Sequence, residues 1–275
     1  MNKILCPVDF SDTSLNAIEF AVEIGKKFHS KVTLLHVFTE EDFNKVLGNK
    51  AKGKSFKELL GMAKNRISQL ADAINEDAVK DGLDKCDFYL EMGELTEKIN
   101  ETAVGENYDL IVMGTTGVSK RSGIFFGSNT EDVIDEVRRP VMCIPSNASF
   151  TKFKKIVYGS DYLEEDKVAI QEVISFATMF DARINVVHVN SENEDEEYKK
   201  FTQELKSFIQ YNKITFTNRQ YDDIGKGLLE YMNSENADLL VAFKRKRNIV
   251  ESIFSKSITK ILSHTSDKPL LILKL

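Results

Sequence analysis

The amino-acid sequence predicts an α/β fold of two tandem domains, each an open, doubly wound parallel sheet of five strands. One reason is the alternation of short apolar runs with longer segments whose apolar residues recur at helical spacing. Strands that alternate with helices in this way form parallel βαβ units. A second reason is that runs such as Leu110-Ile111-Val112-Met113 are apolar throughout, which is typical of a sheet covered on both faces.

The third reason is an internal duplication. Residues 3–37 match residues 155–189 at an offset of 152, and residues 109–144 match residues 238–273 at an offset of 129. The second copy is therefore 23 residues shorter between the two matching blocks. A repeat of this size indicates two copies of one domain.

We place the two domains at residues 1–147 and 152–275, on either side of the polar segment Ser146–Ser149. In the first copy, the expected strands are Ile4–Val8, Val32–Phe38, Phe88–Glu91, Leu110–Met113 and Val141–Ile144. The first expected helix is capped by Ser11 or Asp12. A long, charged helix is expected over 56–79, and its apolar face consists of Leu59, Met62, Ile67, Leu70 and Ile74. Two shorter helices are expected at Thr96–Val104 and Asn129–Val137.

Composition sets limits on the class of protein. The chain has 275 residues, of which 42% are hydrophobic and 29% charged, as in ordinary soluble proteins with two cores. No apolar run is long enough to span a membrane, and the net charge of −6 disfavours a nucleic-acid or anionic-membrane surface. Cys6, Cys86 and Cys143 have no metal-ligand spacing, and Cys6 and Cys143 lie in apolar strand patterns, where a free cysteine is typical of a buried thiol. We expect a cytoplasmic protein.

A glycine-rich segment follows the fourth expected strand. Gly114-Thr115-Thr116-Gly117 is followed, after nine residues, by Gly127-Ser128-Asn129-Thr130, which opens a helix. Glycines allow a ligand to approach the backbone, and the free N–H groups at a helix start favour phosphate. The residues alone thus predict a site for a phosphate-containing ligand, with a tightly packed glycine connection as the alternative.

These residues resemble a known family. The strand end Pro7-Val8-Asp9-Phe10-Ser11, the strand end Leu35-His36-Val37, the segment Asp109–Gly114 and the spacing G-2x-G-9x-G-[S/T] are similar to ATP-binding universal stress proteins. The resemblance covers the first copy and, more weakly, the second, so it is to the tandem members. It implies an adenine nucleotide α-hydrolase-like fold and two domains paired through their last strands (Val141–Ile144 and Leu270–Leu273) as an intramolecular pseudo-dimer. The apolar face of the long helix favours further homodimerisation.

The resemblance also implies one ATP site per chain, in the first domain, with Mg²⁺. Ribose and phosphates would contact Gly114, Gly117, Gly127 and Ser128, and adenine would contact Asp9 and Val37. Ser128 or Thr130 are candidate contacts of the phosphate-bound Mg²⁺; no metal site made by the protein alone is expected. The whole set carried over is Pro7, Asp9, Val37, Met113, Gly114, Thr115, Thr116, Gly117, Val118, Ser119, Lys120, Gly127, Ser128, Asn129 and Thr130.

Asp9 has a second interpretation, as a helix-cap or turn residue, since Asp161 occupies the same place in the second copy. That copy has Phe243, Lys246 and Lys256 where the first has its three glycines, so we expect a degenerate loop there. Its basic run 244–247 is interpreted as a solvated loop, with binding of an anion or an acidic partner as the alternative.

We find no catalytic constellation. His36 and His188 occupy equivalent strand ends and are expected to be hydrogen-bonded structural residues. The expected function is that of a nucleotide-dependent stress-response or regulatory protein that is not an enzyme. The alternatives are an ATP-independent interaction module with a protein partner, a slow ATP hydrolase, and an adenine-nucleotide α-hydrolase that forms AMP.

Overall fold

The computed structural model describes residues 1–39, 55–115, 128–190, 195–245 and 267–274. The chain divides into two compact units, and the division falls between Ser146 and Asn147. Each unit holds one copy of the repeat, and each is described by itself below.

The first unit is a five-stranded parallel sheet in the order β3-β2-β1-β4-β5. Its strands are β1 (Lys3–Pro7), β2 (Lys31–Phe38), β3 (Lys85–Met92), β4 (Leu110–Gly114) and β5 (Val141–Ile144). Its helices are α1 (Asp12–Phe28), α4 (Phe56–Ala78), the short 3₁₀ turn η1 (Val79–Asp81), α5 (Leu95–Gly105) and α6 (Ser128–Glu136).

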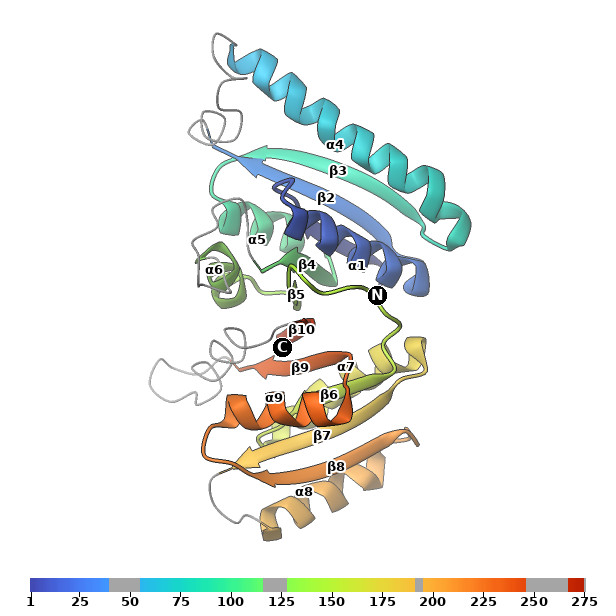
Figure 1. Ribbon diagram of the computed structural model, residues 1–275, viewed down its shortest axis with the longest axis vertical. Helices are drawn as coiled ribbons and strands as arrows, with labels where there is room; N and C mark the ends of the chain where they lie inside the picture. The colour runs from blue at the N-terminus through green and yellow to red at the C-terminus, as the bar shows by residue number, and fades with distance from the viewer. Residues whose placement is uncertain (40–54, 116–127, 191–194, 246–266, 275) are drawn as a thin grey trace. The chain divides into compact units, whose positions relative to one another are not determined.

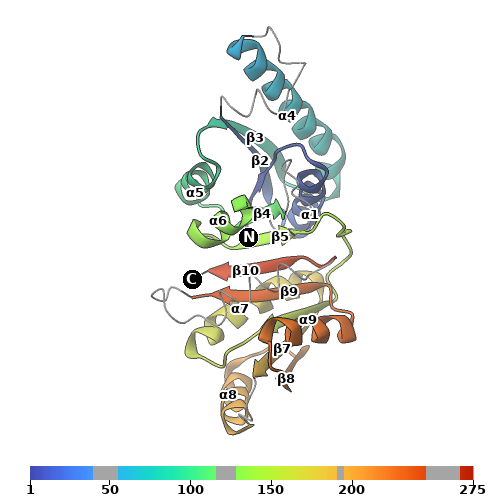
Figure 2. The same cartoon turned by 60° about the vertical axis from the view of Figure 1, so that its left-hand side comes forward.

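The helices cover both faces of this sheet. Helices α1 and α4 pack on one face, and α5 and α6 lie together on the other (Figure 2). Because β1 lies between β2 and β4, the chain winds outward to β3 and then returns to the other side of β1. In doubly wound sheets, ligands bind at such a switch point, at the carboxyl ends of the strands. The switch point of this sheet is between β1 and β4.

The second unit repeats this arrangement, with a parallel sheet in the order β8-β7-β6-β9-β10 (Figure 1). Its strands are β6 (Lys155–Gly159), β7 (Arg183–Asn190), β8 (Ile214–Gln220), β9 (Leu239–Lys244) and β10 (Leu270–Lys274). Its helices are α7 (Glu164–Phe180), α8 (Asp195–Phe208) and α9 (Ile224–Glu235). The doubly wound fold is thus confirmed for both copies, whereas pairing of the two domains stays a prediction.

Local signals set the helix boundaries in the first unit. Ser11 caps α1, since its Oγ accepts a hydrogen bond from the Ser14 N–H. Helix α4 begins with a capping box, in which Ser55 Oγ accepts from the Glu58 N–H and the Glu58 carboxylate accepts from the Ser55 N–H. Both starts agree with the sequence pattern.

Apart from shifts of one residue at element ends, two details of the first unit differ from the sequence pattern. Strand β3 begins at Lys85 rather than Phe88, because its first residues pair with β2 although they are polar. Met62 is 37% exposed, whereas Leu59, Ile67 and Ala71 of the same helix are buried. Met62 lies at the margin of that apolar stripe, so only part of the expected face is covered. Among the described residues, no helix is long and apolar enough to cross a membrane.

The three cysteines are free and buried, which predicts inert thiols. Burial, with the nearby Asp87 carboxylate, raises the pKa of the Cys86 thiol to about 12, and burial also raises the pKa of Cys6. We expect no reaction of the folded protein with a disulfide-exchange reagent at pH 8, and reaction of all three thiols in urea. Fast modification of one thiol without urea would contradict this packing.

Candidate functional site

The carboxyl ends of β1 and β4 bring together the described part of the predicted nucleotide site. After β1, the chain makes a tight turn in which Phe10 has a φ of 61°. Asp9 Oδ1 accepts hydrogen bonds from the Ser11 N–H at 3.0 Å and from the Ser11 hydroxyl at 2.6 Å. One carboxylate oxygen of Asp9 therefore fixes the turn that leads into α1. This contact supports the structural interpretation of Asp9 and leaves its role toward a ligand a prediction.

Gly114 ends β4 against the first turn of α1. A Cβ on Gly114 would lie 2.7 Å from Thr13 Cγ2 and 3.0 Å from the carbonyl carbon and oxygen of Thr13. The 2.7 Å contact is shorter than a Cβ atom can make without a shift of its neighbour, so α1 approaches the strand this closely because residue 114 is glycine. The packing alternative thus accounts for this glycine without a ligand.

Thr130 connects helix α6 to the same strand end. Its hydroxyl lies 3.2 Å from Gly114 O and 3.3 Å from Thr115 O, and both carbonyls are acceptors. The side chains of Met113, Thr115 and Thr130 are all buried. Thr130 therefore holds α6 beside the end of β4 in this structure, and Thr115 and Met113 offer a ligand mainly their backbone groups.

An aromatic and cationic group lies at the ends of β1 and β2. His36 Nδ1 is 2.7 Å from Val8 O, so Nδ1 carries the proton, because a carbonyl only accepts. The His36 ring lies 4.8 Å from that of Phe10, and the Arg66 guanidinium stacks 4.2 Å above Phe10. Sequence reasoning missed Phe10 and Arg66 as part of this site. The available signal for Phe10 was the aromatic Tyr162 at the matching position of the second copy.

The remaining predicted contacts are placed only in part. Pro7 is buried and Val37 half-buried at the strand ends, and Ser128 and Asn129 open α6, with Asn129 exposed. The calls that lie outside the described residues are Thr116, Gly117, Val118, Ser119, Lys120 and Gly127.

The second domain builds the same turn from related residues. Tyr162 has a φ of 58° and stacks on His188 with ring centroids 4.0 Å apart. His188 Nδ1 lies 2.6 Å from Ser160 O, the counterpart of the contact between His36 and Val8. Both histidines are hydrogen-bonded between neighbouring strands, as expected.

At the switch point, however, the second domain differs, because its own side chains fill the place. Arg245 follows β9 and lies at the position of Thr116 in the first copy. Its guanidinium donates to the Asp166 carboxylate at 2.7 Å and also to Asp161. Asp166 is 1% exposed and accepts further bonds from the Tyr158 hydroxyl, the Ser160 hydroxyl and the N–H groups of Asp161 and Leu163.

The electrostatics of this cluster follow from its burial. Burial raises the pKa of Asp161, an effect that Arg245 partly offsets. Burial and the Asp166 carboxylate hold the pKa of Tyr158 well above its ordinary value, so its hydroxyl remains a donor. The Asp166 position corresponds to Ser14 in the first copy. A buried carboxylate and its cation thus appear together in one copy and are both missing from the other.

This cluster corrects the interpretation of the basic run 244–247 as a solvated loop. The Arg245 side chain is 12% exposed and forms two ion pairs, and Phe243, which replaces Gly114, is buried. Lys246 and Arg247 lie outside the described residues. The guanidinium of Arg245 is therefore neutralised within the second switch point.

The fold and its two switch points define a tandem, doubly wound α/β protein with one internally filled site. The model of the universal stress protein family matches residues 1–145 and again 152–274. The chain therefore belongs to the universal stress protein family and carries two copies of its domain.

Individual relatives agree with this assignment. Two universal stress proteins of Methanocaldococcus jannaschii are 31% and 32% identical; each match covers 52% of this chain, and 93% and 81% of the relative. A universal stress protein from Archaeoglobus fulgidus has a similar fold, with a TM-score of 0.74 at 16% identity over 99% of this chain and 96% of the other.

Proposed function

We propose that the first domain binds one ATP with Mg²⁺ and that the protein acts as a nucleotide-dependent regulator in a stress response. The observation that carries this proposal is the difference between the two switch points. The second is filled by Arg245, Asp161 and Asp166. The Asp166–Arg245 pair cannot form in the first, since Ser14 and Thr116 take the places of these two residues in the sequence.

The residues around the first switch point suit an adenine nucleotide. Val37 and the turn at Asp9 flank the end of β1, and α6 begins beside the end of β4. The N-terminus of a helix next to glycine-rich backbone favours phosphates. The described residues include no cluster of three His, Cys, Asp or Glu side chains able to hold a metal ion. In the proposed complex, Mg²⁺ is accordingly held by the phosphates, with Ser128 or Thr130 as candidate protein contacts.

The first test is the nucleotide content of protein purified without added nucleotide. We expect about one ATP or ADP per chain after denaturation and chromatography, because a site with a helix start and backbone donors binds phosphate tightly. In Gly117→Val, a bulky side chain enters the predicted loop, and we expect the bound nucleotide to be lost. Lys246→Val changes the matching position of the second copy and should keep it.

A protein that is empty as purified and is not stabilised by excess Mg-ATP would reject the proposal. The second candidate, an ATP-independent interaction module, would then account better for the chain. It also predicts that Gly117→Val retains full function in cells, whereas the nucleotide-dependent regulator loses it. Slow hydrolysis of ATP is tested separately, by measuring whether the bound ATP is converted to ADP over several hours.

A further inference from the structure

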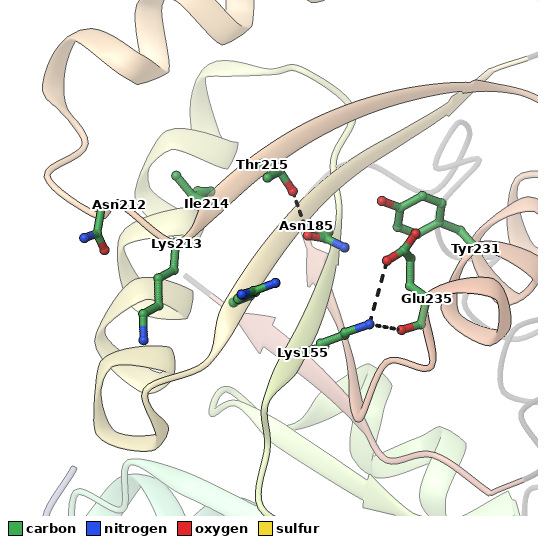
Figure 3. Close-up of a pocket in the computed structure, with 9 residues that line it drawn as sticks. Lys155, Asn185, Asn212, Lys213, Ile214, Thr215, Tyr231 and Glu235 are labelled. Atoms are coloured by element: carbon green, nitrogen blue, oxygen red, sulfur yellow. Dashed lines mark hydrogen bonds and ion pairs between the residues drawn. The ribbon is translucent and has the colours of Figure 1, made fainter.

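Two adjoining hollows lie at the amino-terminal edge of the second domain's sheet, where β6, β7 and β8 begin. Their volumes are about 550 and 430 Å³, and they share Lys155, Arg183 and Lys213. The larger hollow is closed on one side by the end of α9 (Figure 3). Since all strands of this sheet are parallel, these hollows lie at the edge opposite the switch point.

The lining of the hollows is strongly basic. Lys152 and Lys154 join the three shared cations, against the two carboxylates of Asp181 and Glu235. Lys155 is turned toward Glu235, as Figure 3 shows, and donates to Glu235 O at 2.5 Å. Lys213 pairs with Asp181, whose side chain is 78% exposed. In the part of the chain that the structure describes, no ion pair is formed by Lys154 or Arg183.

The first domain offers a direct comparison, because the strand registers match. Val32 pairs with Cys86 there, and Ile184 pairs with Ile214 here. The residues just before these pairs are Lys31 and Lys85 in the first domain, and Arg183 and Lys213 in the second. Both domains thus have two cations at the same places.

A carboxylate that pairs with both cations is found only in the first domain. Asp87 there lies 2.7 Å from both Lys31 Nζ and Lys85 Nζ. Although partial burial opposes it, hydrogen bonds from these lysines hold the pKa of Asp87 below its ordinary value. In the second domain, Thr215 takes this position and donates to Asn185 Oδ1 at 2.6 Å (Figure 3). The exposed Asn212 likewise replaces Asp84, so both carboxylates at the start of this strand are absent while the cations are retained. Lys213 pairs instead with the exposed Asp181, which takes the place of His29.

We propose that this edge of the second domain binds an acidic peptide segment of a partner protein, whose carboxylates pair with Arg183, Lys213 and Lys154. Small-molecule sites enclose most of the ligand, whereas Lys152, Lys154, Arg183 and Asn212 are all exposed around these hollows. An extended chain can cross both hollows, and Asn185, Asn212 and Thr215 supply donors and acceptors for its backbone. Nucleic acid and anionic membranes carry negative charge over an area wider than these hollows, so the chain's net charge of −6 opposes them, whereas a short acidic peptide is close enough to the local cations for their attraction to dominate.

The test is binding of a fluorescently labelled octaglutamate peptide to the full chain at low salt, followed by anisotropy. Thr215→Asp restores the carboxylate of the first domain, and Arg183→Gln removes one cation. We expect each to weaken binding at least about fivefold, since each removes attraction between exposed charges. The matched control is Asp87→Thr in the first domain, which should bind the peptide at least as well as the wild type. Nucleotide content should stay unchanged in all three variants, which separates this result from failure of the ATP site. Melting temperature should stay unchanged in Thr215→Asp and Arg183→Gln and fall slightly in Asp87→Thr, which loses two ion pairs.

The proposal is overturned by three outcomes. One is that Thr215→Asp binds the peptide as well as the wild type, or that neither binds it. Another is that inorganic phosphate at millimolar concentration displaces the peptide, which assigns the hollows to a small anion. The third is that an oligonucleotide, or vesicles with anionic lipid, bind more tightly than the peptide and that Thr215→Asp abolishes this binding. That result would assign the hollows to nucleic acid or membrane.

Discussion

Replacing Arg245 with methionine is expected to destabilise the second domain by about 3–5 kcal/mol, the usual cost of removing one partner of a buried ion pair. The Asp166 carboxylate is 1% exposed and would lose the cation beside it while remaining buried. Its remaining partners are the neutral Tyr158 and Ser160 hydroxyls and two backbone N–H groups. Hydrogen exchange of β6 and α7, resolved by mass spectrometry, measures the loss within this domain alone.

Two further variants isolate the buried charge as the cause. Adding Asp166→Asn to Arg245→Met removes the uncompensated carboxylate, so we expect a large part of the stability to return. Arg219→Met also replaces an arginine, which lies on the exposed edge strand against Tyr231, and should cost no more than about 1 kcal/mol. Unchanged exchange in Arg245→Met would show that water already solvates the cluster.

The pH dependence of the Arg245→Met variant follows from the pKa of Asp161. Burial raises that pKa in the folded state, and Arg245 counteracts the rise. A group with a raised folded pKa favours the folded state when it is protonated, and this contribution is lost as the pH rises through the folded pKa. Without Arg245 the pKa should rise further. We therefore expect the stability deficit of Arg245→Met to shrink as the pH falls from 7 toward 5.

The fold was predictable from the sequence because each signal was local or repeated. Ser11 begins α1 through a hydrogen bond to a residue three positions away, and the duplication doubles the evidence for the strands inside the two matching blocks. Strand β3 was harder to delimit because Lys85 and Asp87 begin it. They are held in the sheet by pairing with β2 and by the Lys31 ion pair, which are not encoded in local apolar periodicity.

The candidate nucleotide site could be predicted only where its residues lie together in one short segment of the sequence. The glycine-rich segment identifies the switch point of the first domain, although Gly114 also has a packing reason that the sequence does not reveal. The inward turn of Arg245 depends on Asp166, which lies 79 residues earlier in the chain. A basic run gives no sign of which cation is buried. The signal that could have indicated it is the carboxylate that replaces the buried Ser14.

Replacing Gly114 with valine is expected to destabilise the first domain by about 2–3 kcal/mol or more, because the new atoms overlap the first turn of α1. The nearest atoms include the backbone carbonyl of Thr13, at 3.0 Å from a Cβ, so no side-chain rotation relieves the contact. The first turn of α1 must shift, and with it the turn that Asp9 and Ser11 form. Nucleotide binding should fall together with stability, as hydrogen exchange of α1 and the nucleotide content would measure.

The glycine's packing role and its proposed ligand role give different results in a series of variants. Gly61→Ala, on α4 where nothing lies within 4 Å, should stabilise the chain by about 0.5–1 kcal/mol through helix propensity. Gly114→Ala should destabilise, and adding Thr13→Ala should return part of the loss, since Thr13 Cγ2 is the nearest contact at 2.7 Å. If Gly114→Ala instead keeps full stability and only the ATP affinity falls, the glycine serves ligand approach alone, and the close packing of α1 on β4 is not what requires it.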